Sequence, residues 1–456
     1  MTAQFVLLGA TGDLTRRYLL PALAQIADDV AGGVRVVGVA QDDLDTAGFR
    51  ERLAEPVPGR LPQGAPASLT ATAEYLRGDV TDPADLSRAL ELATAGRGAD
   101  AGDDPVVVYL ALPHVLFEPV VEALAEVELP AATRVVVEKP FGQDGEGARR
   151  LNAALARVVP EERTFRVDHF LAKQTVLNVL GLRFANRFFE AVWNSTHVAG
   201  VDIVFDESVD AQARANYYDR SGALRDMVQN HLLQLLTYVA MEPPQSMRPA
   251  ELSARKVDVL RAVRPLDDEA VRTSTVRARY TAGTVDGEHV DAYVDAPGVD
   301  PARGTETYAE VVLHVDTWRW SGVPFRLRTG KALGADRREV VVRFRDVPHA
   351  VFAGPRPPAN ELRLQLDPDR LSLRVQLNGS GDPFDLESAE LDTELARQDP
   401  GPYGQLLLAV VAGDTRLSAH AAEAEEGWRI VEPVLAAWER GEVPLREYPA
   451  GSDGPA

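Results

Sequence analysis

The chain of 456 residues contains no cysteine. Disulfides, iron–sulfur clusters, cysteine-ligated zinc and thiol catalysis are therefore excluded. Long apolar runs are also missing, so the sequence predicts no membrane-spanning helix. The N-terminus has neither a basic leader nor a small-residue cleavage site, which does not fit a signal peptide. We therefore expect a cytoplasmic protein.

Positive charge is scarce, and lysine is scarcer still. The 48 basic residues stand against 69 acidic ones, which leaves a net charge of −21. Nucleic acid and anionic membranes are poor partners for such a chain. Lysine is a compact point charge whereas arginine is a planar fork, so a lysine in this background is a candidate for a specific role. Four of the basic residues are lysine, namely Lys139, Lys173, Lys256 and Lys331.

The hydrophobic pattern changes along the chain and predicts two domains, as the length also does. Short β-branched runs at residues 5–8, 34–39, 106–110 and 134–137 alternate with helix-compatible stretches, which is typical of a parallel sheet covered on both faces. Closely spaced alternating runs between residues 311 and 375 indicate an antiparallel sheet. We therefore predict an α/β domain over residues 1–167, followed by an α+β domain with a large, mainly antiparallel sheet over residues 168–456.

A glycine-containing turn joins the first predicted strand to a helical stretch. Glycine at such a junction lets the backbone approach a pyrophosphate, which the helix N-terminus can bind. The spacing is G-x-x-G rather than G-x-G-x-x-G, and the alternative is a plain strand-to-helix turn. Its place on the first strand of a βαβ unit favours a Rossmann-type dinucleotide site. The turn comprises Gly9, Ala10, Thr11, Gly12, Asp13 and Leu14.

Cofactor choice is usually set just after the second strand, where this chain has Gln41 and Asp42. An NADP site uses arginine there for the 2′-phosphate, and an NAD site uses a carboxylate for the ribose hydroxyl. The cofactor is thus NAD or NADP, with NAD favoured. Equally open is the alternative that Asp42 and Asp43 cap the next helix. Arginines that could bind a 2′-phosphate instead are Arg16, Arg17 and Arg35.

Three further segments each contain one of the lysines, and a fourth carries a histidine on a helix predicted over residues 224–240. The lysine segments are Glu138-Lys139-Pro140-Phe141-Gly142, Asp168-His169-Phe170-Leu171-Ala172-Lys173 and Gly330-Lys331-Ala332-Leu333. Together with the glycine turn and the late Gly427-Trp428-Arg429, they make essentially the whole chain resemble the glucose-6-phosphate dehydrogenase family. The resemblance implies oxidation of glucose 6-phosphate at C1 to 6-phosphoglucono-1,5-lactone, in the oxidative branch of the pentose phosphate pathway.

His231, on that helix, is the candidate general base. Oxidation of a sugar hemiacetal requires removal of the C1 hydroxyl proton, and histidine has a suitable pKa for this near neutrality. A carboxylate should orient its ring. Asp226 is five residues earlier, about 140° around a helix of 3.6 residues per turn, so the two do not share a face. The resemblance implies that Asp168 pairs with His231 and that Asp226 binds a sugar hydroxyl. In isolation, His231 would be a half-buried structural histidine.

His169 and Lys173 are four residues apart and would share one face of a helix, forming a cationic pair suited to phosphate. The resemblance implies that they bind the 6-phosphate. The family has a tyrosine between them where this chain has Phe170, so one hydroxyl donor is missing.

The resemblance assigns other residues to the substrate. It implies that Lys139 reaches both sugar and cofactor, that Glu207 binds a sugar hydroxyl, and that Lys331 binds the substrate. Each would otherwise be read as a surface residue. The family has a glutamine where this chain has Asp367 after its Asn-Glu-Leu run, so that contact is not carried over.

No histidine or carboxylate spacing predicts a metal site. The resemblance implies a homodimer or homotetramer formed through the sheet of the second domain, which also binds the substrate. Two alternatives stay open, a paralogue that oxidises a different sugar or phosphosugar and a catalytically silent regulator. Lys256 receives no role, and the alternation of Trp318 and Trp320 predicts a strand with both rings on one packed face.

Overall fold

The computed structural model describes residues 2–55, 67–95, 104–352, 356–382, 384–396 and 398–455. These residues form two compact units. Unit 1 comprises Met1–Lys173, Ser246–Ser253 and Gln398–Glu425, and unit 2 comprises Gln174–Gln245, Ala254–Arg397 and Glu426–Ala456. The predicted boundary between residues 167 and 168 gives each domain one continuous stretch of sequence, and it stays a prediction. The compact units differ from it because unit 1 also contains two later segments.

Unit 1 is built on a parallel sheet, as the apolar runs predict. Within the described residues this sheet has seven strands in the order β17-β6-β5-β4-β1-β2-β3, of which all but β17 run parallel. Its strands are β1 (Ala3–Leu8), β2 (Val34–Ala40), β3 (Glu74–Arg77), β4 (Val106–Leu110), β5 (Thr133–Glu138), β6 (Thr164–Val167) and β17 (Ser418–Ala419).

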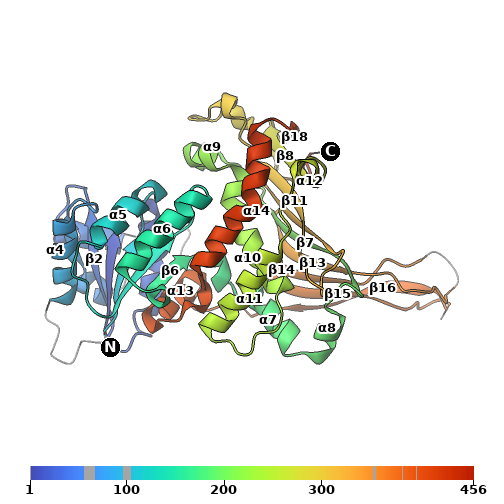
Figure 1. Cartoon of the computed structure of the whole chain (residues 1–456), viewed down its shortest axis with the longest axis horizontal. Helices are drawn as coiled ribbons and strands as arrows, with labels where there is room; N and C mark the ends of the chain where they lie inside the picture. Colours follow the sequence, from blue (N-terminus) through green and yellow to red (C-terminus); the bar gives the residue numbers. More distant parts are fainter. Residues whose placement is uncertain are drawn as a thin grey trace. The chain divides into compact units, whose positions relative to one another are not determined.

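Helices cover both faces of this sheet (Figure 1). Alternate strand residues point to opposite faces, so Phe5 and Leu7 join one buried cluster while Val6 and Leu8 join the other. The first cluster packs against η1 (a π-helix, Thr15–Leu19), α1 (Leu20–Ile26), α2 (Thr46–Ala54), α3 (Ala67–Thr72) and α13 (Pro402–Ala412). The second packs against α4 (Pro83–Thr94), α5 (Phe117–Leu124) and α6 (Gly145–Val158).

Unit 2 is built on a larger mixed sheet that is mainly antiparallel, as predicted. Among the described residues its order is β16-β15-β14-β13-β7-β12-β11-β8-β18, with parallel pairing only of β7 with β12 and of β8 with β18. The strands are β7 (Val198–Asp206), β8 (Thr275–Thr281), β11 (Tyr308–His314), β12 (Pro324–Gly330), β13 (Arg337–Phe344), β14 (Glu361–Leu366), β15 (Asp369–Asn378), β16 (Leu386–Glu394) and β18 (Leu445–Pro449). A separate hairpin pairs β9 (Gly283–Val285) with β10 (Glu288–Val290).

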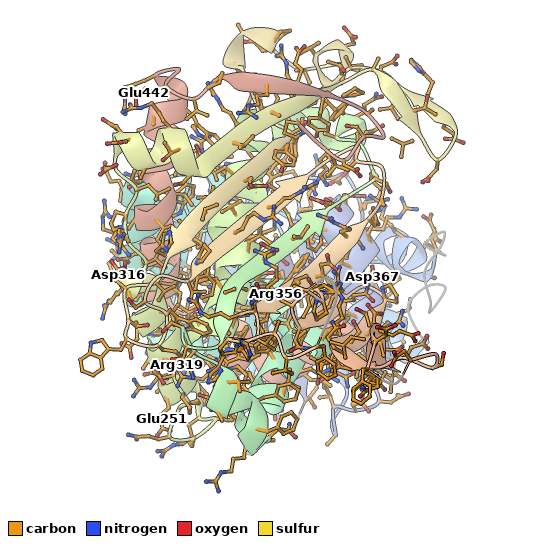
Figure 2. The ribbon with its side chains drawn as sticks, turned by 90° about the vertical axis from the view of Figure 1, so that its right-hand side faces the viewer. Glu251, Asp316, Arg319, Arg356, Asp367 and Glu442 are labelled. Atoms are coloured by element: carbon orange, nitrogen blue, oxygen red, sulfur yellow. The ribbon has the colours of Figure 1, made fainter. Side chains whose placement is uncertain are left out.

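A π-helix, η7 (Leu224–Leu232), continues into α10 (Leu233–Ala240) and contacts the central strands β7, β11 and β12. The other helices with residues in unit 2 are α7 (Gln174–Phe184), α8 (Arg187–Val192), α9 (Ala215–Ala223), α11 (Pro249–Ala262), α12 (Asp268–Ser274) and α14 (Ala421–Glu439). Figure 2 looks onto the other face of the sheet, where many side chains lie in front of the strands. No helix in the described part of the chain is long and apolar enough to cross a membrane.

The predicted packing of Trp318 and Trp320 on one strand face is wrong. Both residues lie in the connection between β11 and β12, where Trp318 is 99% exposed and Trp320 is 1% exposed. The Trp320 indole donates to the Ala240 carbonyl at 2.8 Å. A turn at this point breaks the two-residue alternation on which the prediction depended.

Candidate active site

The glycine turn lies at the carboxyl end of β1, the edge at which parallel α/β sheets bind ligands. Gly9 has φ +88°, and a Cβ there would lie 2.4 Å from the carbonyl oxygen of Ala111. Thr15 Oγ1 donates to the Gly9 carbonyl at 3.0 Å and Gly12 N–H donates to the same oxygen at 3.0 Å. At Gly9 the turn therefore approaches Ala111 more closely than a residue with a Cβ could. Its binding of a dinucleotide pyrophosphate stays a prediction.

Asp42 stands at the carboxyl end of β2, next to this turn. The Thr11 hydroxyl donates to its Oδ2 at 2.5 Å. The cap of α2 is instead Asp45, whose side chain accepts from Gly48 N–H at 2.8 Å. The alternative that Asp42 serves as this helix cap is thus wrong. Its carboxylate is exposed, and its contact with a ribose hydroxyl stays a prediction.

Each of the three arginines considered for a 2′-phosphate contacts a carboxylate. Arg35 pairs with Glu74 at 3.3 Å, Arg17 with Asp13 at 3.2 Å, and Arg16 with Glu55 at 3.7 Å. Asp43, beside Asp42, pairs with Arg77 at 2.6 Å.

Lys139 follows β5, so it stands at the same sheet edge, and its peptide bond to Pro140 is cis. The preceding Glu138 is buried and accepts a 2.5 Å hydrogen bond from the Tyr109 hydroxyl of β4. Burial raises the pKa of Glu138 to about 7; the Tyr109 hydrogen bond and the Lys139 charge oppose this, and the Asp168 charge adds to it. Glu138, Lys139 and Asp168 are thus electrostatically coupled within unit 1.

Asp168 is 1% exposed and accepts from Phe170 N–H at 2.9 Å, which caps a single 3₁₀ turn, η5 (His169–Ala172). The shared helix face expected for His169 and Lys173 therefore does not form, because Lys173 is already extended. Both side chains instead contact Phe170, with the His169 ring 4.8 Å and Lys173 Nζ 5.2 Å from its centroid. The His169 ring also stacks on Tyr403 at 5.3 Å. His169 and Lys173 thus both lie against the Phe170 ring.

In unit 2, His231 is 1% exposed and lies near the end of the π-helix η7. Its helix also carries Asp226, which accepts from the Tyr217 hydroxyl at 3.2 Å. A π-helix forms hydrogen bonds between residues five apart, so such residues lie about one turn from each other. The premise of an α-helix with 3.6 residues per turn is therefore wrong here, and Asp226 and His231 come to the same side of the helix.

Glu306 is a residue that the sequence reasoning missed. Its buried carboxylate accepts from Leu224 N–H at 3.0 Å, at the first residue of η7. Gly222 makes this approach possible, because a Cβ at Gly222 would lie 2.4 Å from Glu306 Oε1. The adjacent Thr307 carbonyl accepts from Lys331 N–H at 3.0 Å. Residues 306 and 307 therefore tie the histidine-bearing helix to the lysine segment.

Glu207 and Lys331 form an ion pair between Oε2 and Nζ, and both side chains are largely buried. Backbone hydrogen bonds hold the two segments together, from Glu207 N–H to the Gly330 carbonyl at 2.9 Å and from Leu333 N–H to the Glu207 carbonyl at 3.0 Å. Ala332 adopts φ +50°, an uncommon conformation for a residue with a side chain. Two residues that the resemblance assigns to the sugar are therefore in direct contact.

Asp367 contacts Arg338, a second residue that the sequence reasoning missed, at 2.5 Å. Arg338 also lies 3.7 Å from Glu207. The departure from the family at Asp367 was the only sign in the sequence that this region differs.

The predicted residues thus gather in two sets. Unit 1 holds Gly9, Ala10, Thr11, Gly12, Asp13, Leu14, Gln41, Asp42, Lys139, Asp168, His169 and Lys173, and unit 2 holds Glu207, Asp226, His231 and Lys331. The pairing of Asp168 with His231 joins the two sets and stays a prediction. Lys256 is buried, with Nζ 5.1 Å from the Tyr238 ring centroid. In the described ranges, no group of three histidine or carboxylate residues could hold a metal ion.

Comparison with known proteins covers both units. The profile of the glucose-6-phosphate dehydrogenase NAD binding domain matches residues 6–178, and that of the C-terminal domain matches residues 180–456. The glucose-6-phosphate 1-dehydrogenase of Gluconobacter oxydans is 41% identical, over 99% of this chain and 94% of that protein.

Two solved structures share the fold over nearly the full length. The glucose-6-phosphate 1-dehydrogenase of Mycobacterium avium has a TM-score of 0.85 at 37% identity, and the match covers 99% of this chain and 95% of that one. A glucose-6-phosphate dehydrogenase in complex with its substrate glucose-6-phosphate has a TM-score of 0.89 at 28% identity, covering 100% and 95%. This chain belongs to the glucose-6-phosphate dehydrogenase family.

Proposed function

We propose that this enzyme oxidises glucose 6-phosphate at C1 to 6-phosphoglucono-1,5-lactone with a nicotinamide dinucleotide. One observation carries the proposal above the others. The buried His231 shares the side of a π-helix with Asp226, in a chain that matches glucose-6-phosphate 1-dehydrogenases over 99% of its length. A buried histidine is suited to taking the proton of a sugar hydroxyl, and a carboxylate on the same side of its helix is suited to accepting a hydrogen bond from another hydroxyl of the sugar.

In the proposed reaction, His231 removes the C1 hydroxyl proton while C1 loses a hydride and becomes the carbonyl carbon of the lactone. When bound, the dinucleotide supplies the hydride acceptor. Asp168 orients the imidazole and stabilises the imidazolium that forms. His169 and Lys173 bind the 6-phosphate, and Lys139, Glu207, Asp226 and Lys331 position the sugar.

The residues at the dinucleotide turn favour NAD over NADP. Asp42 presents an exposed carboxylate that accepts from Thr11, and a carboxylate at this position repels a 2′-phosphate. The nearby arginines Arg16, Arg17 and Arg35 each contact a carboxylate, so a 2′-phosphate would have to compete for them.

Phe170 lacks the hydroxyl of the family's tyrosine, but this difference does not by itself favour another sugar. The imidazole of His169 and the ammonium group of Lys173 are still present beside the Phe170 ring. The dimer or tetramer predicted through the unit 2 sheet and the cytoplasmic location both stay predictions. The exposed Leu377 of β15 and Leu391 of β16 fit an association through the end of that sheet.

The proposal is tested by following absorbance at 340 nm with glucose 6-phosphate, glucose and glucosamine 6-phosphate, each with NAD and with NADP. We expect the highest kcat/KM with glucose 6-phosphate and NAD. A higher kcat/KM for another sugar would support the paralogue, and ligand binding without NAD(P)H formation would support the silent regulator. A strong preference for NADP would contradict the proposed role of Asp42.

A further inference from the structure

Arg338, the second residue of β13, is fixed by carboxylates from two directions. Its guanidinium contacts Asp367 at 2.5 Å and Asp336 at 3.0 Å, and its Cζ lies 5.2 Å from the Phe205 ring centroid. The Arg338 side chain is 19% exposed, and its buried Nε has no hydrogen-bond partner among the described residues. In Figure 2, Asp367 lies toward the right of the view, and Asp316 and Arg319 lie toward the left.

The same guanidinium approaches Glu207 from the side that Lys331 leaves open. Arg338 lies 3.7 Å from Glu207 Oε1, and Lys331 binds the other oxygen, Oε2. The Glu207 carboxylate thus lies between two cations, each of which restricts one oxygen. Lys331 hydrogen-bonds to one oxygen, and the nearby Arg338 guanidinium attracts the other electrostatically, so the two cations together favour one orientation of the carboxylate toward a ligand.

Charge explains why Asp367 is tolerated close to this group. Glu207, Asp336 and Asp367 bring three negative charges. Two cations form the ion pairs with these carboxylates, and without Arg338 only Lys331 would remain to offset them. Arg338 contacts all three carboxylates, so the effect of Asp367 reaches Glu207 through a single side chain.

We propose that Arg338 is a positioning residue that orients Glu207 for a sugar hydroxyl, and that Asp367 influences substrate choice through Arg338 without touching the sugar. The proposal rests on the proposed function, which gives Glu207 its contact with the hexose. It predicts that the three residues act as one unit.

The first test replaces Arg338 by Met. We expect KM for glucose 6-phosphate to rise about tenfold while kcat changes less than about threefold, because binding of the sugar is affected more than proton transfer. KM for the dinucleotide should stay the same. The matched control is Arg370→Met, since Arg370 of β15 also pairs with an aspartate, Asp392 at 2.6 Å, but contacts none of the proposed site residues. An unchanged KM in Arg338→Met would overturn the proposal.

The second test is a double-mutant cycle with Asp367→Asn. If Asp367 acts through Arg338, the double variant should have the same KM as Arg338→Met alone, although Asp367→Asn by itself raises KM about threefold. Multiplied effects of the two substitutions would show that Asp367 acts independently, and would overturn that part of the proposal.

Substrate discrimination distinguishes a positioning role of Arg338 from a merely structural one. We expect Arg338→Met to lower the kcat/KM ratio of glucose 6-phosphate over galactose 6-phosphate and mannose 6-phosphate, whereas Arg370→Met leaves both ratios unchanged. Arg338→Lys keeps the charge and serves if the Met variant does not fold. The Lys variant should have a KM for glucose 6-phosphate between those of the wild-type enzyme and Arg338→Met. A KM and kcat/KM ratios equal to those of the wild-type enzyme would overturn the proposal. Failure of the wild-type enzyme to oxidise glucose 6-phosphate would instead contradict the proposed function.

Discussion

Glu138 shows how burial sets the charge of a carboxyl group beside the proposed site. Its pKa is raised to about 7 from an ordinary 4.5, chiefly by burial and despite the hydrogen bond from Tyr109. Between these two values the folded protein holds a proton that the unfolded chain has lost. The free energy of unfolding should therefore decrease as pH rises through this range.

Glu138→Gln tests this account, because an amide cannot titrate but its oxygen can still accept from Tyr109. We expect the wild-type free energy of unfolding, measured with urea, to fall by roughly 1 to 3 kcal/mol more than that of the variant between pH 4.5 and pH 7. Parallel pH profiles for the two proteins would show that the pKa of Glu138 is the same in the folded and unfolded states.

The residues that the sequence reasoning found and those that it missed differ in a physical way. Lys139 and Lys331 stand out because the chain otherwise uses arginine, and their motifs are local. Glu306 acts on Leu224, 82 positions away, and Arg338 acts on Glu207 from another strand. Such contacts depend on strand register and helix placement, which no local pattern determines.

The turn after β1 requires glycine at position 9. Gly9 and Gly33 both have positive φ, at +88° and +77°. Of the two, only Gly9 lies so close to a backbone atom that an added Cβ would clash with it. Gly9→Ala should therefore cost more stability than Gly33→Ala, which meets only backbone strain of about 1 kcal/mol.

Thermal unfolding and dinucleotide titration of both variants check this prediction. We expect Gly9→Ala to lower both Tm and dinucleotide affinity, and Gly33→Ala to leave the affinity unchanged. Equal losses of affinity would mean that the close approach at Gly9 does not serve the dinucleotide site.

The helix carrying His231 marks the limit of periodicity arguments. Residues 224–240 were predicted to be helical, and they are, but Leu224–Leu232 is a π-helix. Apolar side chains alternate with polar ones closely enough to fit either winding, and tertiary packing decides between them. The relation between Asp226 and His231 could therefore not be predicted, although each was identified.

Across the chain, the sheets were the most predictable feature. Buried parallel strands are continuous apolar runs, and several strands of the unit 2 sheet alternate, as the observed burial of β12 and β14 shows. The return of Gln398–Glu425 to unit 1 could not be predicted, because β17 and α13 join it through contacts that lie far apart in sequence.

The net charge of −21 makes local cations important for an anionic substrate. Lys139 and Lys173 lie in unit 1 and Lys331 lies in unit 2, each within a motif of the proposed site. Lys256 is the exception, because it is buried against Tyr238 in unit 2.

The proposed chemistry depends above all on His231, so the decisive measurement is the steady-state kinetics of His231→Asn with glucose 6-phosphate. The matched control is His314→Asn, because His314 on β11 has no proposed role. We predict that His231→Asn lowers kcat about 10²- to 10⁴-fold, as loss of a general base does, while the Kd for glucose 6-phosphate changes little. Turnover close to that of the wild-type enzyme and of His314→Asn would contradict the assignment of His231 as the base.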